Sequence, residues 1–231
     1  YLTDDPWNPI HRRRCFLANL PLYDHVFSTK QALRQRLEAA GTPSTSWLPF
    51  AYDPALHHPP STIEAEPADV LFVGTGAKER LPWLAALSDL PGITRRLHGN
   101  DWQRLATPGW QRREAVIGDA YCQAIGSARV VLGLLRQANG DLSTDRSYEI
   151  GAIGGCGLYQ DSPEHRALLT GYPDEGFFNS PEQLRERVLH LLARPDLQRQ
   201  LRRLGSAALQ RPEHTYAQRL RTILDWAEGQ P

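Results

Sequence analysis

An alternation of short apolar runs with helix-like patterns limits the fold of this chain more than any other feature of its sequence. The run at 69–73 (DVLFV) is almost entirely apolar and is followed by Gly-Thr-Gly, which is typical of a strand buried on both faces of a parallel sheet. Further strand-like runs lie at 93–98, 129–135, 156–160 and 175–178. Helix-like segments separate most of them, near 78–88, 118–126 and 145–154. We therefore predict an α/β fold with a Rossmann-like, doubly wound parallel sheet.

Three helices are predicted to close the chain, near 181–193, 196–209 and 214–228. In the first and the last of them, apolar residues recur at positions i, i+4, i+7 and i+8, which is the spacing of one helix face. These residues are Leu184, Val188, Leu191 and Leu192 in the first helix and Tyr216, Leu220, Ile223 and Leu224 in the last. Each helix therefore has an apolar face that needs a packing partner.

A proline-rich stretch at 51–67 shows no apolar periodicity and has the signature of a linker. Before it, predicted strands at 23–28 and 45–50 flank a predicted helix at 30–40, which is too little for an independent sheet. We therefore predict a boundary near 66. Residues 1–66 would be the end of an N-terminal α/β domain with its hinge, 67–212 a complete Rossmann-like domain, and 213–231 a C-terminal helix.

The composition argues against several classes of protein. Basic and acidic residues balance at 26 each, and nucleic-acid binding depends on an excess of basic charge. No apolar run approaches the roughly 20 residues that a membrane-spanning helix needs. The three cysteines are widely spaced and form no metal-binding pattern, which favours a reducing, cytoplasmic location without a metal site. The chain has no methionine, which suggests a piece of a longer protein.

The turn Gly74-Thr75-Gly76 follows a predicted buried strand and precedes a predicted helix. Glycines allow a ligand to approach the backbone, and a helix N-terminus favours phosphate, with Arg80 in the first turn as a further cation. The alternative is a tight turn without a ligand. A dinucleotide fingerprint would need a third glycine where Glu79 stands, and an acidic residue at the end of the next strand. An NAD site is therefore disfavoured.

Two further segments are expected at the same end of the sheet, because ligands bind beyond the carboxyl ends of parallel strands. His98 and Gly99 end the second predicted strand, and Tyr121 lies in the first turn of a predicted helix. An aromatic ring and backbone groups in these places could frame a base. The alternatives are an ordinary strand-end histidine and a tyrosine in the core.

The segment from 139 to 155 is the most informative part of the sequence, because its polar residues gather before and within one helix. Asp141, Ser143, Arg146 and Glu149 lie there, and the last two share a helix face. Arginine suits forked binding of phosphate oxygens, and a carboxylate suits ribose hydroxyls. The alternative is a surface salt bridge between residues three apart, with the glutamate near the positive end of the helix dipole.

The chain resembles the spore-maturation-type glycosyltransferases, which belong with the two-domain, GT-B-like transferases that use nucleotide sugars. The resemblance extends from about 20 to 226. It is carried by the hinge Leu48–Pro54, the strand and turn Asp69–Gly76, His98-Gly99-Asn100, Thr144–Gly155, Glu164-His165, Phe177–Ser180, Glu182–Leu184, His214–Tyr216 and Arg219-Leu220. The segment around Arg146 and Glu149 is the most specific of these.

The resemblance implies a bacterial hexosyltransferase that moves a sugar from a nucleoside diphosphate to an unidentified acceptor, which could be a glycan, a protein or a small molecule. It implies Arg146 and Glu149 as the catalytic residues. It also implies donor contacts from Gly74, Thr75, Gly76, Arg80, His98, Gly99, Tyr121, Asp141, Ser143 and Tyr148. Related transferases hold the donor with Glu-x7-Glu, whereas this chain has Asp141 at the first position, which puts its sugar contact in doubt.

No DxD motif occurs in 67–212, so we expect a metal-independent enzyme with no cofactor besides its donor substrate. The resemblance also implies that the last helix crosses back to the N-terminal lobe. Two other functions stay open. One is a binding or scaffold protein that kept the fold without turnover. The other is a different α/β enzyme, such as an NAD-dependent oxidoreductase or a sugar-phosphate epimerase.

Overall fold

The computed structural model describes residues 2–3, 5–8 and 14–229, and the chain divides into two compact units. Unit 1 comprises Tyr1–Phe50 and Arg136–Leu142, and unit 2 comprises Ala51–Leu135 and Ser143–Pro231. Each unit has a sheet of its own. The proline-rich stretch after Phe50 belongs to unit 2, whereas the predicted domain boundary lay near 66.

Unit 2 contains a six-stranded, fully parallel sheet with the strand order β6-β5-β4-β7-β8-β9. The strands are β4 (Val70–Val73), β5 (Arg95–His98), β6 (Gln111–Arg113), β7 (Val130–Gly133), β8 (Gly157–Gln160) and β9 (Phe177–Phe178). In unit 2 the first strand, β4, lies in the middle of the sheet. The strands β5 and β6 follow on one side of it, and β7, β8 and β9 follow on the other. This confirms the Rossmann-like α/β fold, and it places the topological switch point between β4 and β7.

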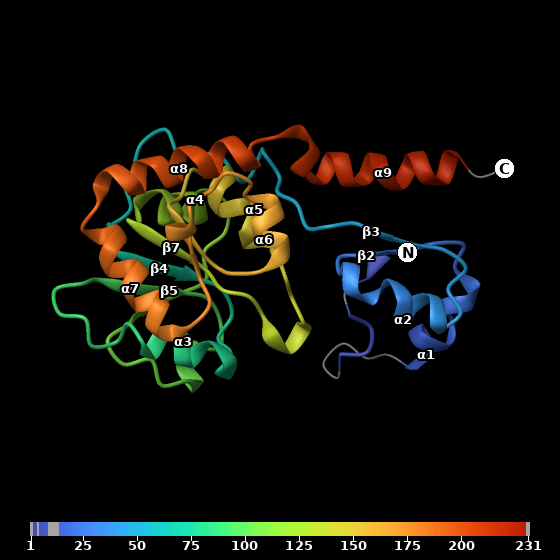
Figure 1. Ribbon diagram of the computed structural model, residues 1–231, viewed down its shortest axis with the longest axis horizontal. Coiled ribbons are helices and arrows are strands. Elements are labelled where there is room, and N and C mark those ends of the chain that lie inside the picture. The colour runs from blue at the N-terminus through green and yellow to red at the C-terminus, as the bar shows by residue number, and fades with distance from the viewer. Residues whose placement is uncertain (1, 4, 9–13, 230–231) are drawn as a thin grey trace. The chain divides into compact units, whose positions relative to one another are not determined.

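Helices cover both faces of this sheet. Figure 1 shows α4 and α8 along one side and α3 and α7 along the other. The helices of unit 2 are α3 (Leu81–Ala85), α4 (Gly118–Ser127), α5 (Asp145–Ala152), α6 (Pro163–Leu168), α7 (Pro181–Leu192), α8 (Pro195–Leu209) and α9 (Tyr216–Glu228). Its 3-10 turns are η3 (Lys78–Arg80), η4 (Trp102–Arg104), η6 (Asp174–Gly176) and η7 (Pro212–His214). The core lies between the sheet and these layers, and all four residues of β4 and of β7 are buried.

Most predicted elements of unit 2 are present, and most have shorter bounds, whereas α4 and α8 are each one residue longer than predicted. The helix predicted near 78–88 is a 3-10 turn followed by the five-residue α3. Strand β6 was not predicted, because all three of its residues are polar or charged and exposed. An edge strand of this kind has no buried face, so it leaves no apolar signal in the sequence.

Unit 1 contains a three-stranded parallel sheet in the order β1-β2-β3. Its strands are β1 (Leu2–Thr3), β2 (Val26–Ser28) and β3 (Thr45–Trp47), its helices are α1 (Arg14–Ala18) and α2 (Arg34–Ala39), and its 3-10 turns are η1 (Leu20–Leu22), η2 (Gln31–Leu33) and η5 (Gln137–Asn139). Its core contains Leu20, Val26, Leu33 and Leu37. The sequence predicted only β2 and β3 here, and β1 adds a third strand to them.

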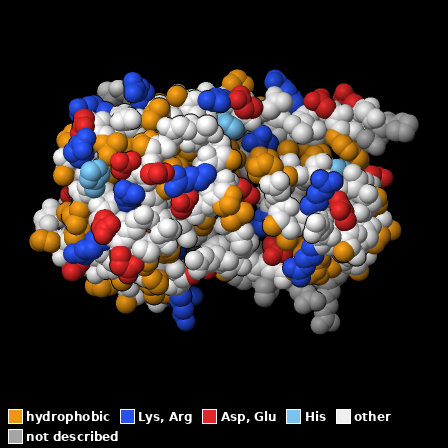
Figure 2. All heavy atoms as spheres, in the orientation of Figure 1, with side chains coloured by type: hydrophobic (Ala, Val, Ile, Leu, Met, Phe, Trp, Pro, Cys, Tyr) orange, Lys and Arg blue, Asp and Glu red, His pale blue; other side chains and the backbone are white. Residues whose placement is uncertain are grey.

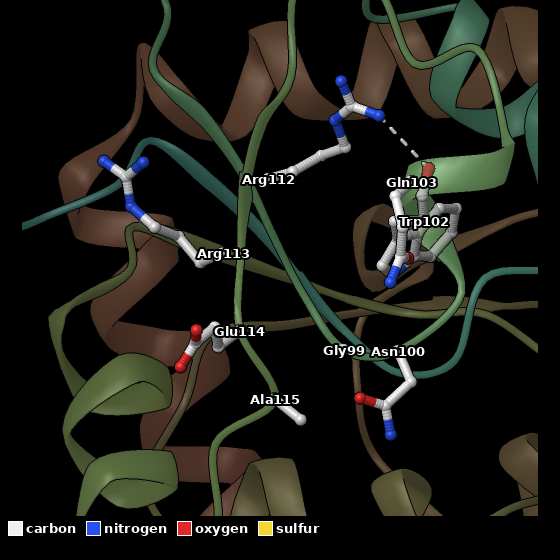
Figure 3. A pocket seen from close by; sticks show the side chains of 8 residues that line it. All are labelled: Gly99, Asn100, Trp102, Gln103, Arg112, Arg113, Glu114 and Ala115. Carbon is white, nitrogen blue, oxygen red and sulfur yellow. Dashed lines mark hydrogen bonds between the residues drawn. The ribbon is translucent and has the colours of Figure 1, made fainter.

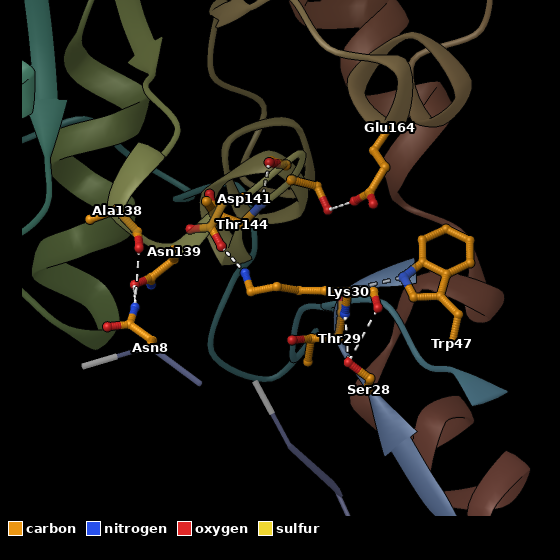
Figure 4. Close-up of polar contacts among 12 residues, drawn as sticks. Asn8, Ser28, Thr29, Lys30, Trp47, Ala138, Asn139, Asp141, Thr144 and Glu164 are labelled. Carbon is orange, nitrogen blue, oxygen red and sulfur yellow. Dashed lines mark hydrogen bonds and ion pairs between the residues drawn. The ribbon is translucent and has the colours of Figure 1, made fainter. Parts of the chain in front are cut away.

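The segment Arg136–Leu142 follows strand β7 in the chain but belongs to unit 1. Lys30 forms a buried ion pair with Asp141, and the Nδ2 of Asn8 donates a hydrogen bond to the Oδ1 of Asn139 at 2.6 Å (Figure 4). Both contacts join residues far apart in the sequence. The carboxylate of Asp141 is therefore already neutralised by a cation of its own unit.

The C-terminal helix α9 has no buried residue. Its apolar residues Leu220 and Leu224 are 60% and 56% exposed. Its beginning is fixed to the start of unit 2, because the Tyr52 amide donates to His214 O and the Tyr216 amide donates to Tyr52 O, each at 3.0 Å. The crossing of this helix to the N-terminal lobe stays a prediction.

Acidic and basic side chains alternate over the surface seen in Figure 2, where no large area has a single sign of charge. This agrees with the zero net charge of the chain. Within the described residues, the helices are too short or too polar for any of them to cross a bilayer.

Candidate functional site

The turn after β4 is packed closely against the end of β5. The Gly74 amide donates to His98 O at 2.8 Å, and the Gly76 amide donates to Asn100 O at 2.7 Å. Gly99 has φ +144°, and a Cβ added to it would lie 2.1 Å from Gly74 O. These glycines therefore serve close contact between two loops, and the Gly74 and Gly76 amides are already used within the protein. Thr75 remains exposed at the tip of the turn.

Arg80 is buried and contacts the same turn through its side chain. Its guanidinium donates to Thr75 O and lies over the ring of Phe72, with 5.0 Å between the Cζ atom and the ring centroid. A planar cation in this position closes the loop and covers an aromatic face. The structure therefore gives Arg80 a role in building the turn, while donor contact by Arg80 stays a prediction.

His98 ends β5, and its Nδ1 donates to Glu114 O at 2.9 Å. Burial lowers the pKa of this imidazole below its ordinary value, which favours the neutral ring. Beside it lies an open pocket of about 720 Å³ at the carboxyl ends of β5 and β6 (Figure 3). The pocket is lined by Gly99, Asn100, Trp102, Gln103, Arg112, Arg113, Glu114 and Ala115.

The first turn of α5 is held firmly in place. Thr144 and Ser147 form a reciprocal capping box, in which the Thr144 amide donates to Ser147 Oγ at 2.8 Å. Ser147 Oγ also lies 2.7 Å from the Nε2 of His165, whose Nδ1 lies 2.6 Å from Gln160 O. A carbonyl can only accept, so Nδ1 carries the proton and Nε2 accepts from the Ser147 hydroxyl. Burial lowers the pKa of His165 to about 4, so this ring is neutral at pH 7.

Arg146 extends from this turn to the switch point of the sheet. Its Nε donates to Val73 O, the last carbonyl of β4, at 3.0 Å. Within the described residues, its two terminal nitrogens make no hydrogen bond to the protein, and the side chain is half-buried. The guanidinium is therefore fixed at one end while its outer donors stay open to a ligand.

Glu149 lies one turn further along α5, and its two carboxylate oxygens have different partners. The Tyr121 hydroxyl donates to Oε2 at 2.8 Å, and the Nε2 of His57 lies 3.5 Å from Oε1. Burial raises the pKa of Glu149, while the neighbouring Arg146 charge acts in the opposite direction. Within the described residues no ion pair joins Arg146 to Glu149, so the predicted alternative of a surface salt bridge is not formed.

The remaining predicted donor residues have protein partners. Ser143 Oγ donates to Glu164 Oε2 at 2.5 Å. Tyr148 is 3% exposed, with its ring 5.6 Å from that of His214, and burial raises its pKa to about 12. Asp141 lies in unit 1, paired with Lys30. Donor contacts by these three residues stay predictions.

The structure thus brings Arg146, Glu149 and Tyr121 together beside the end of β4. Sequence reasoning missed His57, which lies in the stretch predicted as a linker. No periodicity marks it, and only the tertiary fold brings it next to Glu149. A site at this edge can hold an anion with Arg146 and a hydroxyl group with Glu149.

A family model described as glycosyl transferase-like matches residues 80–225, which is more than half of the chain. Among solved structures, a mutant of S. aureus TarM in complex with Fondaparinux, alpha-GlcNAc-glycerol and UDP has a TM-score of 0.66 at 8% identity, covering 97% of this chain and 49% of that one. T4 phage BGT in complex with UDP and Mn2+ has a TM-score of 0.62 at 15% identity, covering 97% and 72%. The pneumococcal O-GlcNAc transferase GtfA in complex with UDP and GlcNAc has 0.61 at 14%, covering 93% and 47%.

These identities are low, so the likeness concerns the fold. The chain spans 45% of the length of a TarM structure and 61% of a T4 phage BGT structure. A comparison with curated proteins gives no match in sequence.

Proposed function

The chain belongs to the glycosyl transferase-like family, and from that premise we propose that unit 2 binds a nucleoside-diphosphate sugar as the donor for a sugar transfer. The observation that carries this proposal is the placement of Arg146 and Glu149 at the switch point of the sheet. An arginine with open donors and a carboxylate with fixed orientation lie on one short helix there. The first suits diphosphate oxygens and the second suits ribose hydroxyls.

In such a transfer, the bond between the anomeric carbon and the β-phosphate oxygen breaks, and an acceptor oxygen bonds to that carbon and loses its proton. The leaving diphosphate gains negative charge as the bond breaks. Arg146, already oriented by Val73 O, would stabilise that charge without having to reorganise. Glu149 would keep the ribose, and with it the diphosphate, in register with the arginine.

Several finer features belong to the same proposal. The transferase would be of the spore-maturation type, would carry a hexose, and would work in the bacterial cytoplasm with no cofactor besides its donor. The lack of a DxD motif in 67–212 supports a metal-independent reaction. The similar structures of T4 phage BGT, TarM and GtfA are complexes with UDP, so uridine diphosphate is the first nucleotide to test.

The acceptor side is proposed to lie with unit 1, which holds most of the predicted segment 1–66, and α9 to return to that lobe. The three-stranded sheet of unit 1 is small compared with the six-stranded donor sheet. We therefore expect this chain to bind a nucleoside diphosphate while transferring sugar poorly or not at all. Rapid turnover by these 231 residues would place the acceptor site elsewhere.

Isothermal titration of the chain with UDP, GDP and NAD tests the proposal. We expect saturable binding of a nucleoside diphosphate and none of NAD. Glu149→Gln should weaken that binding by about tenfold or more, because a hydrogen bond to a charged group is worth roughly 1.5–3 kcal/mol. Glu186→Gln, on the exposed side of α7, is the matched control and should bind as the native chain does. A folded chain that binds neither UDP nor GDP would overturn the proposal.

A further inference from the structure

His57 lies in a tight turn that fixes the orientation of its ring. The His57 amide donates to Asp53 O at 2.7 Å, and the Asp53 amide donates to the Nδ1 of His57 at 3.1 Å. Asp53 Oδ1 also accepts from the Ala55 amide at 2.9 Å, which keeps the turn closed. Because Nδ1 accepts a backbone hydrogen bond, the proton of the neutral imidazole lies on Nε2. The ring therefore presents an N–H donor on the side away from its own turn.

The Nε2 atom lies near the carboxylate of Glu149. The Nε2 of His57 lies 3.5 Å from Oε1, and the Tyr121 hydroxyl holds Oε2 at 2.8 Å. The His57 and Tyr121 rings stand at 89° to each other, with their centroids 5.9 Å apart. The side chains of His57 and Glu149 are only 15% and 12% exposed. Two perpendicular rings thus bracket one carboxylate and limit the rotamers that it can adopt.

The two oxygens of Glu149 are not held equally. The contact at Oε2 is a full hydrogen bond, whereas 3.5 Å at Oε1 is longer than a normal one. Oε1 therefore keeps acceptor capacity for a ligand while the positive edge of the imidazole still orients it. Two neighbouring charged groups act on the pKa of this carboxylate: Arg146 lowers it and Asp145 raises it.

We propose that His57 is a positioning residue that holds Oε1 of Glu149 ready for a ribose hydroxyl, and that it thereby sets the preference of the site for ribonucleotides over deoxyribonucleotides. The inference depends on the proposed function, since it assigns a specificity role within the same donor site. A histidine that served packing alone would affect all nucleotides equally. A positioning histidine affects only those that carry the hydroxyls.

The test is a cycle of protein and ligand changes. The native chain, His57→Phe and His57→Gln are titrated with UDP and with 2′,3′-dideoxy-UDP, and with the corresponding guanosine pair. Phe keeps a ring without an N–H donor, and Gln restores a donor at similar reach. We expect His57→Phe to weaken UDP binding by about tenfold and dideoxy-UDP binding by less than about twofold, with most of the loss recovered in His57→Gln.

His58→Phe is the matched control, because it makes the same change at an exposed neighbour. Its ribose preference should equal that of the native chain. An equal loss for both forms of the nucleotide in His57→Phe, or an unchanged preference, would overturn this inference while leaving the proposed function intact. Failure of the native chain to bind UDP and GDP would instead overturn both. If the Phe variant does not fold, His57→Leu takes its place, because it also removes the N–H donor: a loss confined to UDP supports the inference, and an equal loss for both forms, or none, overturns it.

Discussion

The turn after β4 and the start of α5 meet at the same edge of the sheet, yet they use their polar groups in different ways. In the turn, the Gly74 and Gly76 amides and the Arg80 side chain are all bonded within the protein. At the start of α5, Arg146 donates one hydrogen bond to Val73 O, and within the part of the chain that the structure describes its terminal nitrogens make no hydrogen bond to the protein. The polar groups of the glycine-rich turn thus close the turn itself, whereas those at the helix start have donors left over; donor contact by either segment stays a prediction. This difference can be tested from both sides.

The largest effect is expected from Gly99→Ala, which should destabilise the turn. Its φ of +144° is unfavourable for an L-residue, and the new Cβ would lie 2.1 Å from Gly74 O. Strain and overpacking together should lower the free energy of unfolding by about 3–5 kcal/mol. Chemical denaturation measures this.

Gly92→Ala is the control for that change, because Gly92 also has a positive φ but no atom lies within 4 Å of an added Cβ. It should cost only about 1 kcal/mol. An equal loss in the free energy of unfolding for the two variants would show that the turn after β4 is not closely packed.

The second prediction separates the two arginines. Arg146→Gln should weaken binding of a nucleoside diphosphate by about 10- to 150-fold, since charged hydrogen bonds are worth roughly 1.5–3 kcal/mol. Arg80→Gln should mainly lower stability, by about 1–3 kcal/mol, because Arg80 supports Thr75 O and covers Phe72. Calorimetric titration and denaturation of both variants give the four values. A larger affinity loss in Arg80→Gln would reverse the roles assigned to the two segments.

The same two segments show what the sequence can predict. The strands β4 and β7 were predicted because they are buried on both faces and leave continuous apolar runs. Arg146 and Glu149 were predicted to lie on one helix because residues three apart share a helix face, and both lie on α5. The turn was ambiguous, because glycine serves close packing and ligand approach equally well. His57 was missed because its contact with Glu149 depends on how distant segments fold together.

Protonation of His165 at low pH should destabilise the folded chain and the start of α5. The pKa of His165 is lowered to about 4 in the folded chain from an ordinary 6.5, so the unfolded chain binds this proton more strongly. The neutral His165 ring makes its full contribution to the free energy of unfolding above pH 6.5. It is lost as pH falls from 6.5 to about 4, by about 1.4 kcal/mol per pH unit, and changes little below that. Ser147 loses its acceptor as the ring protonates, which loosens the start of α5.

Denaturation of the native chain and of His165→Gln across this pH range measures that effect. The variant should lack this part of the acid slope, because the glutamine amide does not titrate. Carboxylates titrate in both proteins, so their contribution cancels in the difference. His190→Gln, which removes an exposed histidine of α7, is the control and should follow the native curve. Parallel curves for His165→Gln and the native chain would contradict the buried neutral ring.

The smallest effect is expected from Tyr121→Phe, which removes the donor at Oε2 of Glu149 and leaves the ring in place. At pH 7 affinity for UDP should fall about two- to fivefold, in line with roughly 0.5–1 kcal/mol for one hydrogen bond.

The hydrogen bond from Tyr121 lowers the pKa of Glu149, so its loss raises the pKa further. A ribose hydroxyl prefers the ionised carboxylate as acceptor, so the acid loss of affinity should begin at a higher pH in the variant. The control is Tyr172→Phe, which removes a hydroxyl that donates to Gly157 O at the beginning of β8. It should change stability without shifting the pH at which the affinity for UDP begins to fall. Titrations with UDP over a series of pH values measure this. If affinity began to fall at the same pH in Tyr121→Phe as in the native chain, Glu149 would not bind the ligand as a carboxylate.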